Sequence, residues 1–218
     1  MRRFEHFTWL NSQQGSLSSA AATILAKMLP SFELLEVLGL SGAGLDEVDV
    51  EKVLKALKSC KLKILNLSKN KVGARGATAL AKMLPSFELL EVLGLFDVVL
   101  DEVDVEKVLK VLKSCKLKIL DLSNNKVGAR GATALAKMSP SLESLEELDL
   151  FEAGLDEVDV EKVLNALKSC KLKILDLGKN KVGARGVTAL AKMLPSLELL
   201  EKLYTTSTSS RPASNIFI

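Results

Sequence analysis

Residues 62–76 read LKILNLSKNKVGARG, and the chain repeats this stretch almost unchanged at 117–131 (LKILDLSNNKVGARG) and at 172–186 (LKILDLGKNKVGARG). Successive copies are 55 residues apart, a period too long for a single helix or strand. A fixed period of this kind is the sequence signature of an array of stacked structural repeats. The repeat therefore predicts the fold, and the role of every other residue depends on its position within the repeat.

Each block of 55 residues contains two shorter units that begin with the pattern Leu-x-x-Leu-x-Leu. A degenerate copy starts at Phe7, and a last copy breaks off after Leu203. The spacing between the units alternates between 27 and 28 residues, and they start at Leu35, Leu62, Leu90, Leu117, Leu145 and Leu172. The alternating polarity of the pattern predicts a short strand with one buried face.

After each predicted strand, apolar residues at helical spacing indicate a helix. Asp46 or Asp49 can act as its N-cap in one unit type, and Pro85 ends it in the other. One strand and one helix cannot bury both of their apolar faces alone, but stacked units can. We therefore expect an α/β solenoid with a parallel β-sheet on the inside and α-helices on the outside.

The units resemble the leucine-rich repeat family, in particular its long, ribonuclease-inhibitor-like subtype, over residues 7–204. The family pattern L-x-x-L-x-L-x-x-N-x-L is complete at 62–72, 117–127 and 172–182. The resemblance implies a horseshoe in which the asparagines of the pattern bind backbone groups of the turn; here these are Asn70, Asn125 and Asn180. The phrases GARGATALAKMLPS and LKALKSCKLKIL are also similar to the repeat regions of animal NACHT-type (NOD-like) immune receptors.

This pattern divides the chain into three parts. Residues 1–34 are expected to form a degenerate N-terminal repeat or cap, and residues 35–199 to form six repeats of alternating length. Residues 200–218 hold a truncated repeat and a Ser/Thr-rich tail that we expect to be disordered. Because Leu200 and Leu203 form a strand without a covering helix, that end is expected to fray or to self-associate.

Composition argues against several partners. The net charge is +3 with 26% charged residues, which is too mild to indicate a nucleic-acid or anionic-membrane partner. No apolar run reaches transmembrane length, and no signal peptide is recognisable, so a cytoplasmic or nuclear location is expected. Cys60, Cys115 and Cys170 recur every 55 residues, too far apart in any stack to pair, and are predicted to be free thiols in the core.

Signatures of enzymes are nearly absent. The only histidine is His6, so neither a histidine-based catalytic arrangement nor a multi-histidine metal site can be built. The stretch VGARG contains glycines but lacks the lysine and Ser/Thr of a P-loop. We therefore expect a protein that is not an enzyme and has no cofactor.

Charges at the second position of each predicted strand alternate in sign. Stacking in sequence order makes these residues neighbours and predicts a ladder of ion pairs: Glu36, Lys63, Glu91, Lys118, Glu146, Lys173 and Glu201. On the outer face, Arg75, Arg130 and Arg185 suggest a basic stripe, which is either a solvated helix face or a site for an acidic partner.

The three blocks differ at 15 of their 55 positions, and nine of these lie in a predicted strand or in the turn after it. SGAG at 41–44, for example, becomes FDVV at 96–99 and FEAG at 151–154. Exposed aromatic side chains within a charged rim are typical of interface hot spots. Drift at exposed sites is the alternative explanation. We predict a partner-binding concave face made of Phe96, Asp97, Asp121, Glu147, Asp149, Phe151, Glu152 and Asp176.

The leading interpretation is a non-catalytic module that binds a protein partner on this face. Family resemblance implies part of an innate immune sensor or a regulatory scaffold. The alternatives are a GTPase-activating protein of the Ran type, a ribonuclease-inhibitor-like inhibitor, and an orphaned array without a role of its own.

Overall fold

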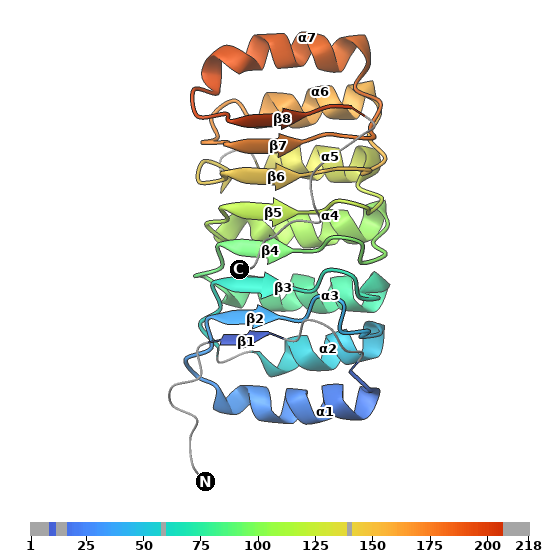
Figure 1. Cartoon of the computed structure of the whole chain (residues 1–218), viewed down its shortest axis with the longest axis vertical. Helices are drawn as coiled ribbons and strands as arrows, with labels where there is room; N and C mark the ends of the chain where they lie inside the picture. The colour runs from blue at the N-terminus through green and yellow to red at the C-terminus, as the bar shows by residue number, and fades with distance from the viewer. Residues whose placement is uncertain (1–8, 12–16, 58–59, 139–140, 207–218) are drawn as a thin grey trace.

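The protein is a single curved stack of strand–helix units, seen in a computed structural model that describes residues 9–11, 17–57, 60–138 and 141–206 (Figure 1). Eight short strands form one parallel sheet in sequence order: β1 (Trp9–Asn11), β2 (Val37–Gly39), β3 (Ile64–Asn66), β4 (Val92–Gly94), β5 (Ile119–Asp121), β6 (Glu147–Asp149), β7 (Ile174–Asp176) and β8 (Lys202–Tyr204). This arrangement confirms the predicted leucine-rich repeat solenoid.

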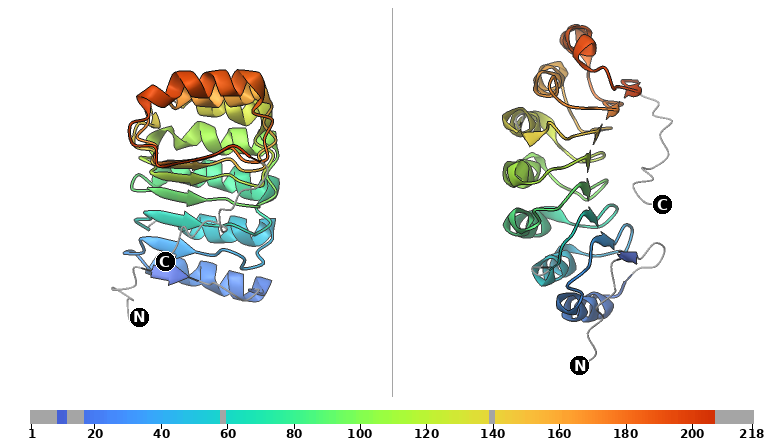
Figure 2. Two further views of the ribbon diagram at one scale, coloured as in Figure 1. Left: turned by 45° about the horizontal axis from the view of Figure 1, so that its top comes forward. Right: turned by 90° about the vertical axis from the view of Figure 1, so that its left-hand side faces the viewer.

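The helices form a second layer outside the sheet, as the right-hand view of Figure 2 shows. They are α1 (Ser19–Met28), α2 (Glu47–Ala56), α3 (Gly73–Met83), α4 (Glu102–Val111), α5 (Gly128–Lys137), α6 (Glu157–Ala166) and α7 (Gly183–Met193). Short 3-10 turns lead back toward the strands at Leu29–Ser31, Leu84–Ser86, Leu112–Ser114 and Leu194–Ser196. The sheet therefore lines the concave face and the helices line the convex face.

The leucines of the repeat pattern fill the space between the two layers. Leu38, Leu65 and Leu93 are partners in adjacent strands and are fully buried, and the pattern continues along the stack. Asp46, which begins its helix, accepts hydrogen bonds from the amides of Val48 and Asp49, so it is the N-cap of α2. The same cap recurs at Asp101 and Asp156.

Asn70 joins two units, because its side chain forms hydrogen bonds with the turn of the unit before it. Its Nδ2 atom donates to the carbonyl oxygens of Leu40 (2.7 Å) and Leu67 (2.8 Å), and its Oδ1 atom accepts from the amide of Leu45 (2.9 Å). Asn125 and Asn180 make the corresponding bonds in the later blocks. These contacts confirm the role that the family resemblance implies for the three asparagines.

Of two further predictions about the stack, the ladder of ion pairs is confirmed in part and the free, buried cysteines in full. Lysine and glutamate side chains at the second strand position form ion pairs between neighbouring units, at Lys63–Glu36 (2.9 Å), Lys118–Glu91 (2.9 Å) and Lys173–Glu146 (2.6 Å). All three cysteines are buried and free, and burial raises the pKa of the Cys60 and Cys170 thiols to about 11. His6 and the tail beyond residue 206 lie outside the described residues.

Candidate functional site

The eight residues predicted to bind a partner fall into three groups in the structure. Four belong to the concave sheet, two are aromatic residues just after the strands, and two lie on the loops that lead to the helices. Sheet register places Asp121 beside Asp149 and Asp149 beside Asp176, so the predicted neighbours do adjoin one another. Their exposure differs from the prediction, and the difference changes what each group can do.

The three aspartates are buried, with at most 5% of their surface exposed, so the expectation that they offer exposed carboxylates on the concave face is wrong. Each carboxylate instead turns toward the loop and accepts a hydrogen bond from the amide two residues later: Ser123 (3.0 Å), Phe151 (3.0 Å) and Gly178 (2.8 Å). Asn66 makes the same bond to Ser68 at 2.9 Å. These side chains therefore stabilise the turn after each strand, as Asp and Asn commonly do.

Burial of three carboxylates in one row has an electrostatic consequence. Burial of the Asp149 side chain, together with the neighbouring charges of Asp121 and Asp176, raises the pKa of its carboxyl group to about 8, against the lowering effect of the hydrogen bond from the Phe151 amide. A proton on Asp149 relieves the repulsion between carboxylates at the centre of the row. The sheet can therefore hold three buried aspartates side by side, because the middle one can carry a proton.

Glu147 lies half-buried on the concave sheet, at a position that is otherwise aliphatic. Its strand partners are Ile119 on β5 and Ile174 on β7. A row of aliphatic side chains thus crosses the concave face and is interrupted by this glutamate: Val37, Ile64, Val92, Ile119 and Ile174. Our sequence interpretation missed this row. The recurrent Val or Ile at the third position of the other units could have predicted it.

Phe96 and Phe151 follow strands β4 and β6 and are half-buried, less exposed than predicted. A lysine from an adjacent unit lies over each ring, with the Lys69 Nζ atom 5.5 Å from the centre of Phe96 and the Lys179 Nζ atom 4.9 Å from that of Phe151. Such cation–π contacts hold a ring in one orientation. The two aromatic residues are thus fixed at the rim, beside the aliphatic row.

Asp97 and Glu152 are exposed and lie on the loops that carry the chain from the sheet to the helices. Both have left-handed backbone conformations, with φ of 51° and 52°. Glu152 pairs with Lys179 at 2.9 Å. These two residues therefore mark the loop edge of the solenoid and not its concave floor.

The outer arginines are engaged by neighbouring helices. Arg75 pairs with Glu51 (2.7 Å) and Arg130 with Glu106 (2.6 Å), while Arg185 is 3.9 Å from Glu161. This pairing favours the interpretation of the basic stripe as a solvated helix face. Within the described ranges, no helix is long and apolar enough to span a membrane, and no group of three or more His, Cys, Asp or Glu side chains is placed to hold a metal ion.

Comparison with known proteins agrees with the repeat architecture. A family profile described as "Leucine Rich repeat" matches residues 58–81, 113–136 and 168–191. The chain is 32% identical to Ran GTPase-activating protein 2 of Caenorhabditis elegans over 175 residues, which is 70% of this chain and 18% of that protein. It is 29% identical to Protein NLRC5 of Ictalurus punctatus over 197 residues, or 88% of this chain and 10% of that protein. The chain thus spans less than a fifth of either relative.

Among solved structures, the tropomodulin C-terminal domain of Caenorhabditis elegans is similar, with a TM-score of 0.51 over 68% of this chain and 92% of that domain. Its sequence identity is 14%, so the likeness concerns the fold alone. The repeat pattern, the stacked strand–helix units and the profile matches agree with one another. The chain is therefore a leucine-rich repeat protein with repeats of the ribonuclease-inhibitor-like type.

Proposed function

We propose that the chain is a non-catalytic protein-interaction module that binds a partner across the concave face, between the aliphatic row and the aromatic rim. The observation that carries this proposal is the pattern of divergence between the blocks. The leucines of the Leu-x-x-Leu-x-Leu pattern are identical in all three, whereas Val37 corresponds to Glu147 and Ser41 to Phe96 and Phe151. A surface that combines aliphatic, aromatic and acidic groups has the composition of an interface core with a polar rim.

The three free thiols fit a reducing compartment, so we place the module in the cytoplasm or the nucleus. The resemblance of the repeats to those of NOD-like immune receptors, together with the similarity to Protein NLRC5, supports a role as part of an immune sensor or a related scaffold. Similarity to a Ran GTPase-activating protein supports the second candidate, a regulator of a Ran-type GTPase. The two candidates differ in the partner, and each has a direct assay.

A capture experiment tests the concave face. The full chain is compared with a double variant, Glu147→Val and Phe151→Ala, in which the valine restores the residue of the first two blocks. Arg130→Ala on the helix face is the control. We expect at least one protein retained by the wild type and by the control but lost by the double variant. Equal capture by the double variant, or loss with the control, would contradict the proposal.

The regulator candidate is tested by adding the chain to Ran loaded with GTP. If the chain acts on the GTPase, phosphate release accelerates in proportion to the amount added. An unchanged rate at a molar excess of the chain rejects this candidate and leaves the scaffold proposal standing.

A further inference from the structure

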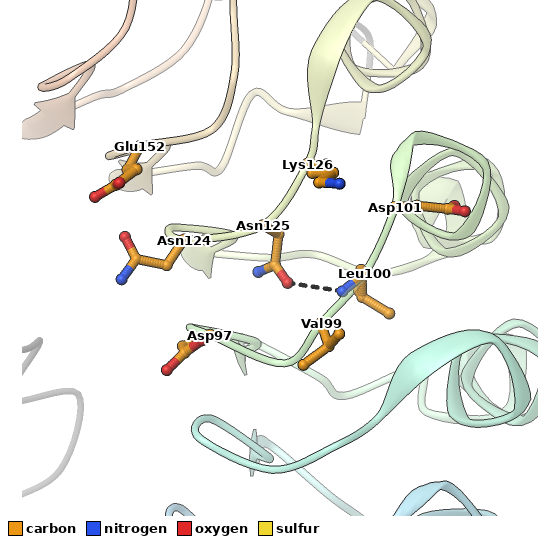
Figure 3. A pocket seen from close by; sticks show the side chains of 8 residues that line it. All are labelled: Asp97, Val99, Leu100, Asp101, Asn124, Asn125, Lys126 and Glu152. Atoms are coloured by element: carbon orange, nitrogen blue, oxygen red, sulfur yellow. Dashed lines mark hydrogen bonds between the residues drawn. The ribbon is translucent and has the colours of Figure 1, made fainter.

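A hollow of about 450 Å³ opens on the loop edge, between the loops that follow β4, β5 and β6 (Figure 3). The first of these loops contributes Asp97, Val99 and Asp101, the second contributes Asn124 and Lys126, and the third contributes Glu152. Figure 3 shows Asn124 between Asp97 and Glu152, with Val99 to the right of Asp97. The hollow therefore has one apolar wall and a mainly acidic one.

The same turn position recurs in successive units and shows what is unusual about this place. Lys69, Asp97, Asn124, Glu152 and Lys179 all occupy it, each with φ between 51° and 56°. In the last pair of units, Lys179 neutralises Glu152 across 2.9 Å. In the middle pair, the position that corresponds to Lys179 is Asn124, so this turn position brings no lysine to Asp97.

Asp97 consequently forms no ion pair within the described part of the chain, although Lys69 lies one unit away with its ammonium over the Phe96 ring. The Oδ1 atom of Asn124 is buried and accepts no hydrogen bond from any described residue. A positive charge with hydrogen-bond donors would satisfy both groups. With Glu152 paired to Lys179, the charges that remain in the lining are Asp97 and Asp101 against Lys126, so the hollow is acidic on balance.

Val99 provides the apolar wall. It is 67% exposed, and its backbone is left-handed with φ of 61°. The other two blocks have Gly44 and Gly154 at this position, both with φ of 70°. The Val99 side chain is therefore mostly exposed to solvent. It is the only aliphatic side chain at this loop position among the three blocks, because the other two have glycine.

We propose that this loop-edge pocket binds an arginine or lysine from an extended segment of a protein partner. The cation lies against Asp97 and the Asn124 amide oxygen, and the aliphatic stem of the same side chain packs on Val99. The site is distinct from the concave face, because neither Glu147 nor Phe151 lines it. It therefore adds a second contact surface to the module and is tested independently of the first.

The test follows amide signals of the isotopically labelled full chain by NMR during titration with acetyl-Ser-Gly-Leu-Arg-Gly-Ser-amide. The same peptide with glutamate in place of arginine is the reference ligand. We expect saturable shifts for residues 97–101 and 124–126 with the arginine peptide and none with the glutamate peptide. Absence of saturable shifts with the arginine peptide, or equal binding of both peptides, would overturn the proposal.

Two variants sharpen the result. Asn124→Lys gives the middle block the residue found at Lys69 and Lys179. The new lysine should neutralise the Asp97 carboxylate and lower the affinity for the arginine peptide at least fivefold. Asn165→Lys is the matched control: it also restores a block residue, found at Lys55 and Lys110, but it changes an exposed position on α6. Equal weakening by both would mean that net charge, and not this pocket, attracts the peptide, and the proposal would fall.

Discussion

Val99 holds a backbone conformation that β-branched residues rarely adopt, with φ of 61°. Strain of this kind costs about 1–3 kcal/mol, whereas the greater freedom of glycine in the unfolded chain costs about 0.5–1 kcal/mol. Val99→Gly should therefore raise the free energy of unfolding by about 1 kcal/mol, as measured by urea denaturation. The reverse change, Gly154→Val, has open space for the new side chain and should lose a similar amount. Destabilisation by Val99→Gly would show that the valine packs in the folded state.

Asp149 should make stability depend on pH in an unusual direction. Burial and the Asp121 charge raise the pKa of its carboxyl group to about 8 from an ordinary value of 3.8. Between these values the folded state holds a proton that the unfolded state has lost, so this group's contribution to stability is complete below about pH 4 and declines as the pH rises through 8. Asp149→Asn cannot titrate, and it can keep the turn bond as Asn66 does. The variant should exceed the wild type in urea midpoint at pH 8, with the gap closing toward pH 4.

Asp101 provides the control for this experiment, because its pKa is shifted the other way. Hydrogen bonds from the amides of Asp104 and Val103 lower the pKa of the Asp101 carboxyl group. Its contribution is therefore lost as the pH falls, and Asp101→Asn should differ from the wild type least at low pH. A gap for Asp149→Asn that widened toward pH 4 would show that Asp149 is ionised in the folded protein.

Every second strand–helix unit is joined to the unit before it through one asparagine, and the cost of losing this asparagine should vary along the stack. Asn125→Ala removes bonds to the Leu95 carbonyl and the Leu100 amide and leaves both groups buried. We expect a loss of about 2–4 kcal/mol, since each unsatisfied buried group costs about 1–3 kcal/mol. Asn180→Ala removes equivalent bonds at a partly exposed site and should cost less. If both variants lose the same free energy of unfolding in thermal or urea denaturation, burial does not determine how much these hydrogen bonds stabilise the fold.

The order of the units could be predicted from the sequence because three independent periodicities agree. Leucines, alternating charges at positions such as Glu36 and Lys63, and the recurrent cysteines all require the same stacking. The concave site was predicted less well. The sequence shows that Asp121, Asp149 and Asp176 lie in one row, but not that each carboxylate turns back to a loop amide. That choice depends on the distance between the strand end and the loop, which only the folded backbone defines.

The loop-edge pocket was also beyond the sequence interpretation. Exchange of Gly44 for Val99 was visible as a difference between blocks, but its meaning depends on the left-handed backbone at both positions. Likewise, Asn124 is seen to stand where a lysine could pair with Asp97 only because Lys179 pairs with Glu152 in the neighbouring block. Comparison between repeats becomes informative when one copy reveals a contact that another copy lacks.

At the level of the complete stack, the last unit exposes apolar surface that inner units bury. Val187 is 61% exposed where Ala77 and Ala132 are fully buried, and Leu194 is 46% exposed where Leu84 is fully buried. We expect concentration-dependent self-association through this end, measurable by sedimentation velocity.

Two changes should reduce this association. Val187→Ala restores the residue of the other blocks, and Leu194→Ser introduces the residue that stands at the corresponding position 139. A wild type that remains monomeric, with β8 amides exchanging as slowly as those of β4, would show that this end is capped. The proposed division into a cap at 1–34, repeats at 35–199 and a terminal segment at 200–218 stays a prediction.

We propose that the strand side and the loop edge of this solenoid, and not its helices, bind the partner. Hydrogen–deuterium exchange of the full chain, alone and with the captured partner, tests it most directly. We expect slower exchange in the complex for strands β4 to β7 and for the loops at 95–101, 122–127 and 150–156, with helices α3 to α6 unchanged. Slower exchange confined to the outer helices would contradict it.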